Sequence, residues 1–135
     1  MPESFFSITL PKTIYQTHMK KILLVEDEVA QSDILKSHLI LAGFQVEVAA
    51  SGEAGLEILK TQDFDLLIID VLMPGMDGPA FYYEVGNKLH KKIPAIILTS
   101  VKSTAYQEDI LEYIVKSEVS PDEIVAKVKH YLKVQ

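Results

Sequence analysis

The chain has 135 residues, a net charge of −6 and no cysteine, and all 13 of its basic residues are lysines. This length suits one domain, and the lack of cysteine excludes disulfides and thiolate–metal sites. An acidic chain without arginine is a poor candidate for binding a nucleic-acid backbone, and no apolar run approaches the ~18 residues that cross a bilayer. We therefore expect neither nucleic acid nor a membrane among its partners.

Residues 1–18 differ in pattern from the rest of the chain. They have no basic start, and polar residues and Pro11 interrupt their apolar side chains, so the segment does not resemble a secretory signal. Met19 directly precedes two lysines and the first clear strand, which marks it as a natural start. We expect a flexible extension over 1–18 and one domain over 19–135. The alternative is that SFFSITL adds an edge strand.

From Lys21 onward, short apolar runs alternate with segments of helical periodicity. The third run, DLLIID, is apolar up to its final aspartate, as expected of a central parallel strand that is buried on both faces. The predicted strands are 21–25, 45–50, 65–70, 95–100 and 112–115.

Four segments predict helices and carry the residues typical of helix ends. Gly43 follows the first helix, and Ser51 is a good N-cap for the second. Gly86 weakens the third, and Pro121 opens the last. The predicted helices are 29–42, 52–60, 79–90 and 121–134. This alternation implies right-handed βαβ crossovers and an α/β fold with an open parallel sheet.

Side chains that can bind ions or take part in catalysis lie where these strands end. Glu26 and Asp27 follow the first strand, and Asp70 ends the third. Thr99 lies at the end of the fourth strand and Lys116 at the end of the fifth. The carboxyl ends of parallel strands meet at one edge of a sheet, and carboxylates gathered there cannot all stay ionised unless a cation binds. Oxygen ligands without histidine or cysteine favour a hard cation such as Mg²⁺.

Each of these residues also has a simpler interpretation. Asp27 is a candidate helix N-cap, and Asp70 a candidate turn former before the Pro-Gly of the next loop. Thr99 suits any strand, and a lone lysine such as Lys116 is most often solvated. Their coincidence at equivalent strand ends favours one shared site over four unrelated roles.

These residues carry a resemblance to a known family. The pair Glu26-Asp27 after KILLV, the segment IIDVLMPGMDG, Thr99 in AIILTS and Lys116 in YIVK together resemble the receiver domain of two-component response regulators. The match runs from about Lys20 to Val134. It implies a doubly wound, five-stranded parallel sheet of the flavodoxin-like (CheY-like) type. It also implies that a histidine kinase or phosphotransfer protein phosphorylates Asp70.

The resemblance also implies a metal site. Asp27, Asp70 and the main-chain carbonyl of Leu72 would hold Mg²⁺, with Glu26 acting mainly through water. The cation would remove the repulsion between a carboxylate nucleophile and an incoming phosphoryl group.

The remaining roles follow from the same resemblance. Lys116 would pair with one phosphoryl oxygen, and the Thr99 hydroxyl would donate to another. When Thr99 turns, Tyr113, three residues before the lysine, would rotate into the vacated space and reshape the surface. Leu72 and Val101 match positions that tune the lifetime of the phosphoryl group. Because neither can orient an attacking water, we expect that lifetime to be long.

The sequence departs from the family pattern at two places. Ser117 stands where the family usually has a proline after a cis peptide bond. We expect a trans bond here, so the direction in which the Lys116 side chain points stays open. The segment between Thr99 and Lys116 is also short. We expect a shortened fourth helix near 103–109, or none, and no output through the family's usual dimer.

The leading functional hypothesis is a stand-alone cytoplasmic phosphoacceptor switch with a kinase or phosphotransfer donor and a downstream protein target. It would catalyse its own phosphorylation without being a turnover enzyme in the usual sense. A second hypothesis is a degenerate receiver that binds partners without phosphorylation. A third is an unrelated enzyme or cofactor binder. Dehalogenase-like phosphatases need an aspartate where Leu72 stands, and nucleotide or flavin binders need a phosphate-cradling loop where this chain has VEDEVA.

Overall fold

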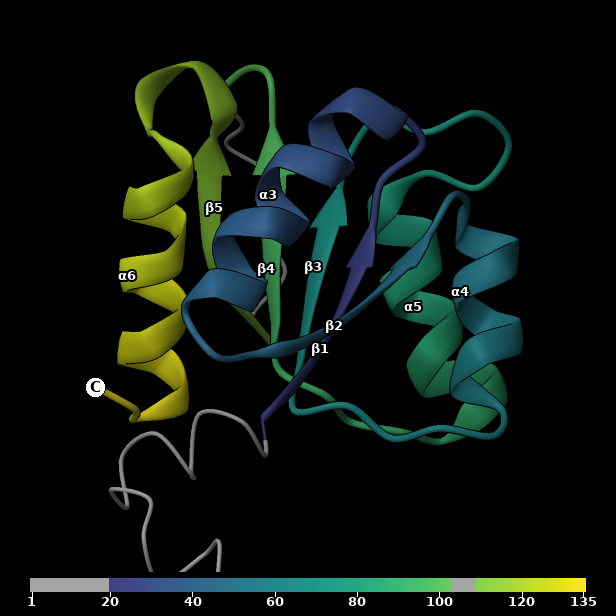
Figure 1. Ribbon diagram of the computed structural model, residues 1–135. Helices are drawn as coiled ribbons and strands as arrows, with labels where there is room; N and C mark the ends of the chain where they lie inside the picture. The colour runs from purple at the N-terminus through teal and green to yellow at the C-terminus, as the bar shows by residue number, and fades with distance from the viewer. Residues whose placement is uncertain (1–19, 103–108) are drawn as a thin grey trace, which may run out of the picture.

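Five parallel strands form one sheet in the order β2-β1-β3-β4-β5 (Figure 1). The computed structural model describes residues 20–102 and 109–135. The central strands β1, β3 and β4 are almost entirely buried, whereas the outer strands β2 and β5 are partly exposed. The strand bounds are β1 Lys21–Val25, β2 Gln45–Ala49, β3 Leu66–Asp70, β4 Ala95–Thr99 and β5 Ile110–Val115.

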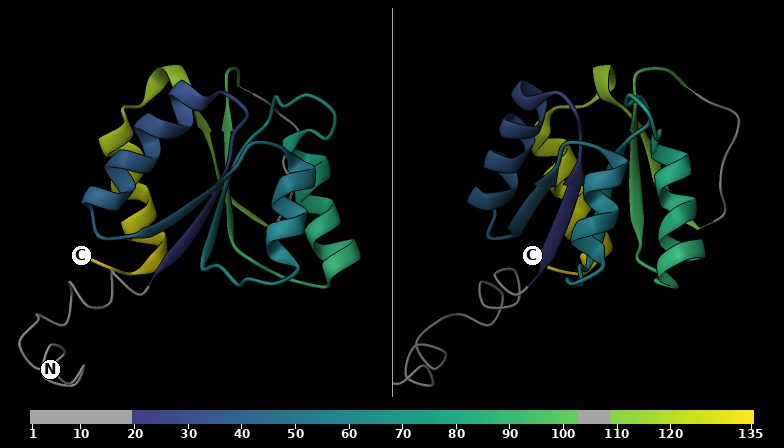
Figure 2. Two further views of the ribbon diagram at one scale, coloured as in Figure 1. Left: turned by 45° about the vertical axis from the view of Figure 1, so that its right-hand side comes forward. Right: turned by 90° about the vertical axis from the view of Figure 1, so that its right-hand side faces the viewer.

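Helices cover both faces of this sheet, as Figure 2 shows. On one face, α3 and α6 pack over a core that includes Leu39, Ile68 and Val128. On the other face, α4 and α5 pack over a second core that includes Leu59, Ile69 and Phe81. The helix bounds are α3 Val29–Leu41, α4 Gly52–Leu59, α5 Gly78–Leu89 and α6 Pro121–Leu132, and the 3-10 turn η1 spans Lys116–Glu118. This arrangement confirms the predicted doubly wound, flavodoxin-like fold.

The helix ends carry local caps, among them the predicted N-cap Ser51 and the predicted stop at Gly43. The Ser51 hydroxyl accepts a hydrogen bond from the main-chain N–H of Ala54, 3.0 Å away, and begins α4. Ser120 and Glu123 form a capping box at the start of α6. Gly43 has a φ of 102°, a conformation that favours glycine, and it follows the end of α3. These local signals explain why the helix boundaries agree with the prediction to within about a turn.

The next two strands are added on opposite sides of β1. The connection after β1 leads outward to β2, whereas β3 lies on the other side of β1. In open α/β sheets this switch point opens a crevice at the carboxyl ends of the strands. The predicted site residues that follow β1 and end β3 therefore lie at the switch point.

The structure differs from the predictions in the last strand. β5 begins at Ile110, two residues earlier than predicted, and its pairing with β4 shifts register between Ala95 and Ile96. Ala95 pairs with Ile110 and Ile96 with Glu112, so Leu111 has no partner in the ladder. This bulge interrupts the alternation of side chains, which is why the periodicity missed the start of the strand.

Two predictions lie outside the described residues. The extension over 1–18 and most of the shortened fourth helix near 103–109 fall on residues 1–19 and 103–108. Within the described parts of the chain, none of the helices is both long and apolar enough to cross a membrane.

Candidate functional site

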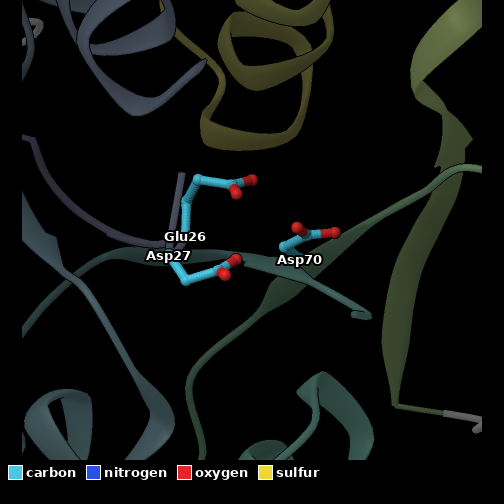
Figure 3. Close-up of side chains that lie close together, drawn as sticks. All are labelled: Glu26, Asp27 and Asp70. Carbon is cyan, nitrogen blue, oxygen red and sulfur yellow. The ribbon is translucent and has the colours of Figure 1, made fainter. Parts of the chain in front are cut away.

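Three carboxylates converge at the switch point. Glu26 and Asp27 follow β1, Asp70 ends β3, and the pairing of Val25 with Ile69 sets the two strand ends side by side. One carboxylate oxygen from each acid lies within 4.8 Å of the others. Figure 3 shows Glu26 and Asp27 extending from the same strand end toward Asp70. Glu26 and Asp70 are only 3% and 4% exposed, so their charges are largely removed from water.

The loop after β3 holds the main chain of Asp70 in place. The N–H of Val71 donates to Leu98 on β4, and the N–H of Gly78 donates back to Val71. A Cβ atom on Gly78 would lie 2.5 Å from the Asp70 carbonyl oxygen, so only glycine allows this close approach. Asp77, rather than Asp70, caps α5. The simpler interpretation of Asp70 as a cap or turn former therefore has no support in the structure.

Asp27 does not cap a helix either. The N-cap of α3 is Glu28, and no side chain caps it. The Glu28 main-chain N–H instead donates to Glu26 Oε1 over 3.1 Å. The local backbone thus orients Glu26 and leaves the Asp27 carboxylate beside the other acids.

Lys116 reaches the cluster although no proline follows it. Its Nζ lies 3.0 Å from Asp70 Oδ2 and 3.3 Å from Glu26 Oε2. No cis peptide bond occurs between residues 20–102 or 109–135, as expected with Ser117 after the lysine. The 3-10 turn η1 begins at Lys116 and carries the chain toward α6. In this structure the Lys116 side chain therefore points toward Asp70 and Glu26 with Ser117 following it.

Burial and crowding alter the proton affinities of the cluster. Burial is the largest influence on Glu26 and, with the negative charge of Asp70, raises its pKa from 4.5 to about 7, although the Glu28 N–H and Lys116 act against the rise. Burial alone would lower the pKa of Lys116, but the hydrogen bond and charge of Asp70, together with Glu26, raise it above the usual value. The site therefore holds its lysine charged and resists a full set of ionised carboxylates.

Thr99 lies at the same edge, at the end of β4, and its hydroxyl is bonded to the main chain of the next loop. Its hydroxyl donates to the Val101 carbonyl oxygen, 2.8 Å away. Tyr113 on β5 lies opposite Ile97 on β4. It is half-buried against the core beneath α4 and α5. A cavity of about 420 Å³ is lined by both Thr99 and Tyr113. The two residues assigned to the switch therefore border one space.

Leu72 and Val101 flank the site from two loops. Their side chains are 67% and 65% exposed, so neither covers the carboxylates completely. A second cavity, of about 540 Å³, opens at the acid cluster and is lined by Glu26, Asp70 and Lys116. It continues between α3 and the start of α6 along apolar side chains. The cavity thus gives a small ion or molecule a route to the carboxylates, although Glu26 and Asp70 are themselves buried.

The donor set fits a hard divalent cation. All three acids supply oxygen and two are buried, and Lys116 pairs with two of them, Glu26 and Asp70, so one positive charge faces up to three negative ones among the residues described. Mg²⁺ prefers such oxygen ligands and retains several waters. The residues present can therefore hold Mg²⁺.

The sequence analysis missed two residues at this site. Gln31, on the first turn of α3, accepts a hydrogen bond from Lys116 Nζ over 3.0 Å. An exposed polar residue on a helix carries no sequence signal of such a contact. Gly78 lies within the predicted motif, and its place directly after the cap Asp77 is the only hint of its close approach to β3.

Comparison with known proteins gives a consistent family. The profile of the response regulator receiver domain matches residues 22–129. The probable transcriptional regulator ycf27 of Cyanophora paradoxa is 36% identical over 125 residues, covering 87% of this chain and 50% of that protein. The transcriptional regulatory protein AfsQ1 of Streptomyces coelicolor is 35% identical over 111 residues, covering 81% and 45%. The chain spans about half the length of these curated relatives.

Solved structures agree with the sequence matches. A CheY-like receiver domain protein from Methanospirillum hungatei superposes with a TM-score of 0.76 at 29% identity, covering 84% of this chain and 94% of that one. The response regulator TrrA of Thermotoga maritima, solved in complex with Mg²⁺–BeF, gives a TM-score of 0.70 at 34% identity, covering 83% and 98%. With this fold, this arrangement of strand-end residues and these matches, the chain belongs to the receiver domain family of two-component response regulators.

Proposed function

We propose that this chain is a phosphoacceptor switch in which Asp70 receives a phosphoryl group with the help of Mg²⁺. The observation that carries the proposal is the contact of Lys116 Nζ with Asp70 Oδ2, 3.0 Å long, beside a three-carboxylate cluster. Burial of an aspartate beside further acids costs free energy of folding, and such an arrangement is typical of functional sites. Phosphoryl transfer to a carboxylate needs this combination of nucleophile and positive charge.

Asp27, Asp70 and the main-chain carbonyl of Leu72 would hold the cation, with Glu26 acting through water. Bound Mg²⁺ would neutralise charge shared by the carboxylates and the incoming phosphoryl oxygens. Proximity of the three acids and the raised pKa of Glu26 support this role, since both indicate a charge that the protein alone does not balance. The complex of the Thermotoga maritima relative with Mg²⁺–BeF supports the same assignment.

In the transfer step, a carboxylate oxygen of Asp70 forms a bond to phosphorus as the bond from phosphorus to the donor nitrogen breaks. The histidine of the donor keeps the electron pair and takes up a proton from solvent. Lys116 pairs with one phosphoryl oxygen as negative charge moves onto the new acyl phosphate. Thr99 exchanges its hydrogen bond to Val101 for one to a second phosphoryl oxygen.

The proposed output follows from the movement of Thr99. A hydroxyl that turns toward Asp70 leaves space in the cavity that Thr99 shares with Tyr113. Rotation of Tyr113 into this space would change the surface formed by β5 and α6. A local change in charge is thus converted into a different arrangement of packed side chains.

The proposed partners are proteins. The donor would be a sensor histidine kinase or a phosphotransfer protein in the cytoplasm, and the target a protein that recognises the changed surface. The curated relatives named as transcriptional regulators are about twice as long as the match. We propose no nucleic-acid contact for the residues described here, which belong to the matched part.

Incubation of the full chain with acetyl phosphate and Mg²⁺, followed by intact-mass measurement, tests the proposal. We expect a gain of one phosphoryl group that is absent in Asp70→Asn and is strongly reduced when the metal is chelated. Lys88→Met is a matched surface control, because Lys88 pairs with Glu84 far from the site. No gain in the wild-type chain would favour the degenerate receiver that acts by binding alone.

A further inference from the structure

We propose that Gln31 is a positioning residue that holds the ammonium group of Lys116 over Asp70. This inference rests on the proposed phosphoacceptor function and adds a residue on α3 to the site. Gln31 lies 85 residues before Lys116 in the sequence, and its Oε1 accepts a hydrogen bond from Lys116 Nζ over 3.0 Å.

Among the residues that the structure describes, the ammonium group has three partners, which matches its three N–H donors. Asp70 and Glu26 provide charged oxygens at 3.0 and 3.3 Å, and Gln31 provides a neutral one at 3.0 Å. A lysine side chain has four rotatable carbon–carbon bonds, so one contact leaves its tip mobile. Partners from β1, β3 and α3 together restrict the tip to one place.

Gln31 is itself held in position. Its Nε2 donates to Glu28 Oε2 over 2.8 Å, one helical turn earlier. The main-chain N–H of Glu28 donates to Glu26 Oε1 over 3.1 Å. Because Lys116 also contacts Glu26, these hydrogen bonds form a closed ring through Glu26, Glu28, Gln31 and Lys116. The ring connects the start of α3 to the start of η1.

Gln31 differs from the other two partners in what the proposed chemistry asks of it. Glu26 and Asp70 both belong to the carboxylate cluster that would hold the cation, and Asp70 is also the nucleophile. Gln31 has neither duty and carries no charge. It is therefore the one described partner of Lys116 that can keep its hydrogen bond to the lysine when the carboxylates are engaged elsewhere.

The test compares variants of the full chain in two measurements. Gln31→Met keeps the length of the side chain and removes the strong acceptor, whereas Gln31→Glu keeps an acceptor oxygen. Gln62→Met is the matched control, because Gln62 Oε1 accepts a hydrogen bond from Lys21 Nζ over 2.6 Å, at the opposite end of β1.

The first measurement is the NMR order parameter of the Lys116 ε-methylene group in metal-free protein. We expect the order parameter to fall in Gln31→Met, to stay near the wild-type value in Gln31→Glu, and to be unchanged in Gln62→Met. An unchanged value in Gln31→Met, or an equal fall in Gln31→Glu, overturns the proposal. This readout does not depend on phosphorylation, so it remains decisive if the wild-type chain takes up no phosphoryl group.

The second measurement is the rate of phosphorylation by acetyl phosphate at saturating Mg²⁺. We expect Gln31→Met to be slower by about fivefold, which corresponds to the typical net contribution of one hydrogen bond, about 1 kcal/mol. Gln62→Met should match the wild type. A wild-type rate in Gln31→Met overturns the positioning role and leaves the proposed function intact, whereas failure of the wild-type chain itself counts against the proposed function.

Discussion

The ionisation of Glu26 is expected to affect the stability of the metal-free protein. Its pKa rises from 4.5 to about 7 on folding, chiefly because of burial. The folded state therefore binds the proton more tightly than the unfolded state. The resulting stabilisation is fully present below about pH 4.5 and is lost as the pH rises through about 7.

We expect the free energy of unfolding of the metal-free chain to fall by on the order of 3 kcal/mol between about pH 5 and pH 8 because of Glu26. Glu26→Gln removes this titration, so its stability should be flatter across the same range. Mg²⁺ should oppose the fall in the wild type, since a bound cation favours the ionised cluster. Thermal melts at several pH values measure these effects. Parallel curves for the wild type and Glu26→Gln would contradict the assignment.

Leu72 is the residue at which the lifetime of the phosphoryl group can be tested. Its exposed side chain flanks the carboxylates but offers no polar group to an attacking water. We expect a wild-type lifetime of minutes or longer, and Leu72→Asn should shorten it severalfold because an amide can orient water near the acyl phosphate. Leu72→Met is the control and should match the wild type. Decay of phosphorylated protein, followed by mass, gives the rates. A wild-type half-life of only seconds would count against this interpretation.

At the residue scale, the sequence predicted the parts of the site that strands deliver. The carboxyl ends of parallel strands lie along one edge of the sheet, so the proximity of Glu26, Asp27 and Asp70 follows from periodicity and topology. The contact of Lys116 with them did not follow, because Ser117 left the direction of its side chain open. The contribution of Gln31 did not follow, because it depends on the angle at which α3 crosses the sheet. α3 packs over the sheet together with α6, and such contacts between distant elements have no counterpart in the local pattern.

At the scale of elements, α5 carries two glycines with opposite expected effects. A Cβ atom on Gly78 would meet the Asp70 carbonyl oxygen at 2.5 Å, whereas one on Gly86 would meet nothing within 4 Å. Gly78→Ala should lower the free energy of unfolding by about 1–3 kcal/mol and displace the end of β3. Gly86→Ala should raise it by about 0.5–1 kcal/mol, because alanine favours the helix.

Urea denaturation of the two variants measures both effects. Phosphorylation by acetyl phosphate adds a second readout, since only Gly78→Ala disturbs the main chain of Asp70. Equal stability changes in the two variants would show that helix propensity alone, rather than the approach of Gly78 to β3, governs both positions.

Most element boundaries followed from local chemistry. Caps such as Ser51 and Ser120, and the stop at Gly43, depend on residues adjacent in sequence, so the sequence specifies them directly. The start of β5 did not follow, because the bulge at Leu111 depends on the partner strand β4. The turn η1 was missed for a similar reason, since KSE carries no strong helical signal of its own.

At the scale of the whole molecule, the strand order predicts which elements the proposed phosphorylation would affect. The site residues Thr99 and Tyr113 come from β4 and β5, which lie on the opposite side of the sheet from β2. With Mg²⁺ and beryllofluoride bound, we expect hydrogen-exchange rates to change in β4, β5 and the start of α6. Exchange in β2 and α4 should change little.

Tyr113→Ala tests whether the aromatic side chain carries this signal. The variant should still bind beryllofluoride, because the groups proposed to hold it are the clustered acids and Lys116, which the substitution leaves in place. The exchange changes in β5 and α6 should shrink, while those next to Asp70 remain. Asp70→Asn is the negative control and should show no response at all. A full remote response in Tyr113→Ala would assign the switch to a different residue.

The bulge in β5 also bears on how the protein behaves in concentrated solution. An outermost strand offers unpaired main-chain groups to other molecules, and a straight apolar strand promotes edge-to-edge aggregation. Here the register shift twists the strand where it begins and leaves Leu111, 38% exposed, out of the ladder. We expect this irregularity to make β5 a poor template for a second chain and to reduce edge-to-edge aggregation at that strand.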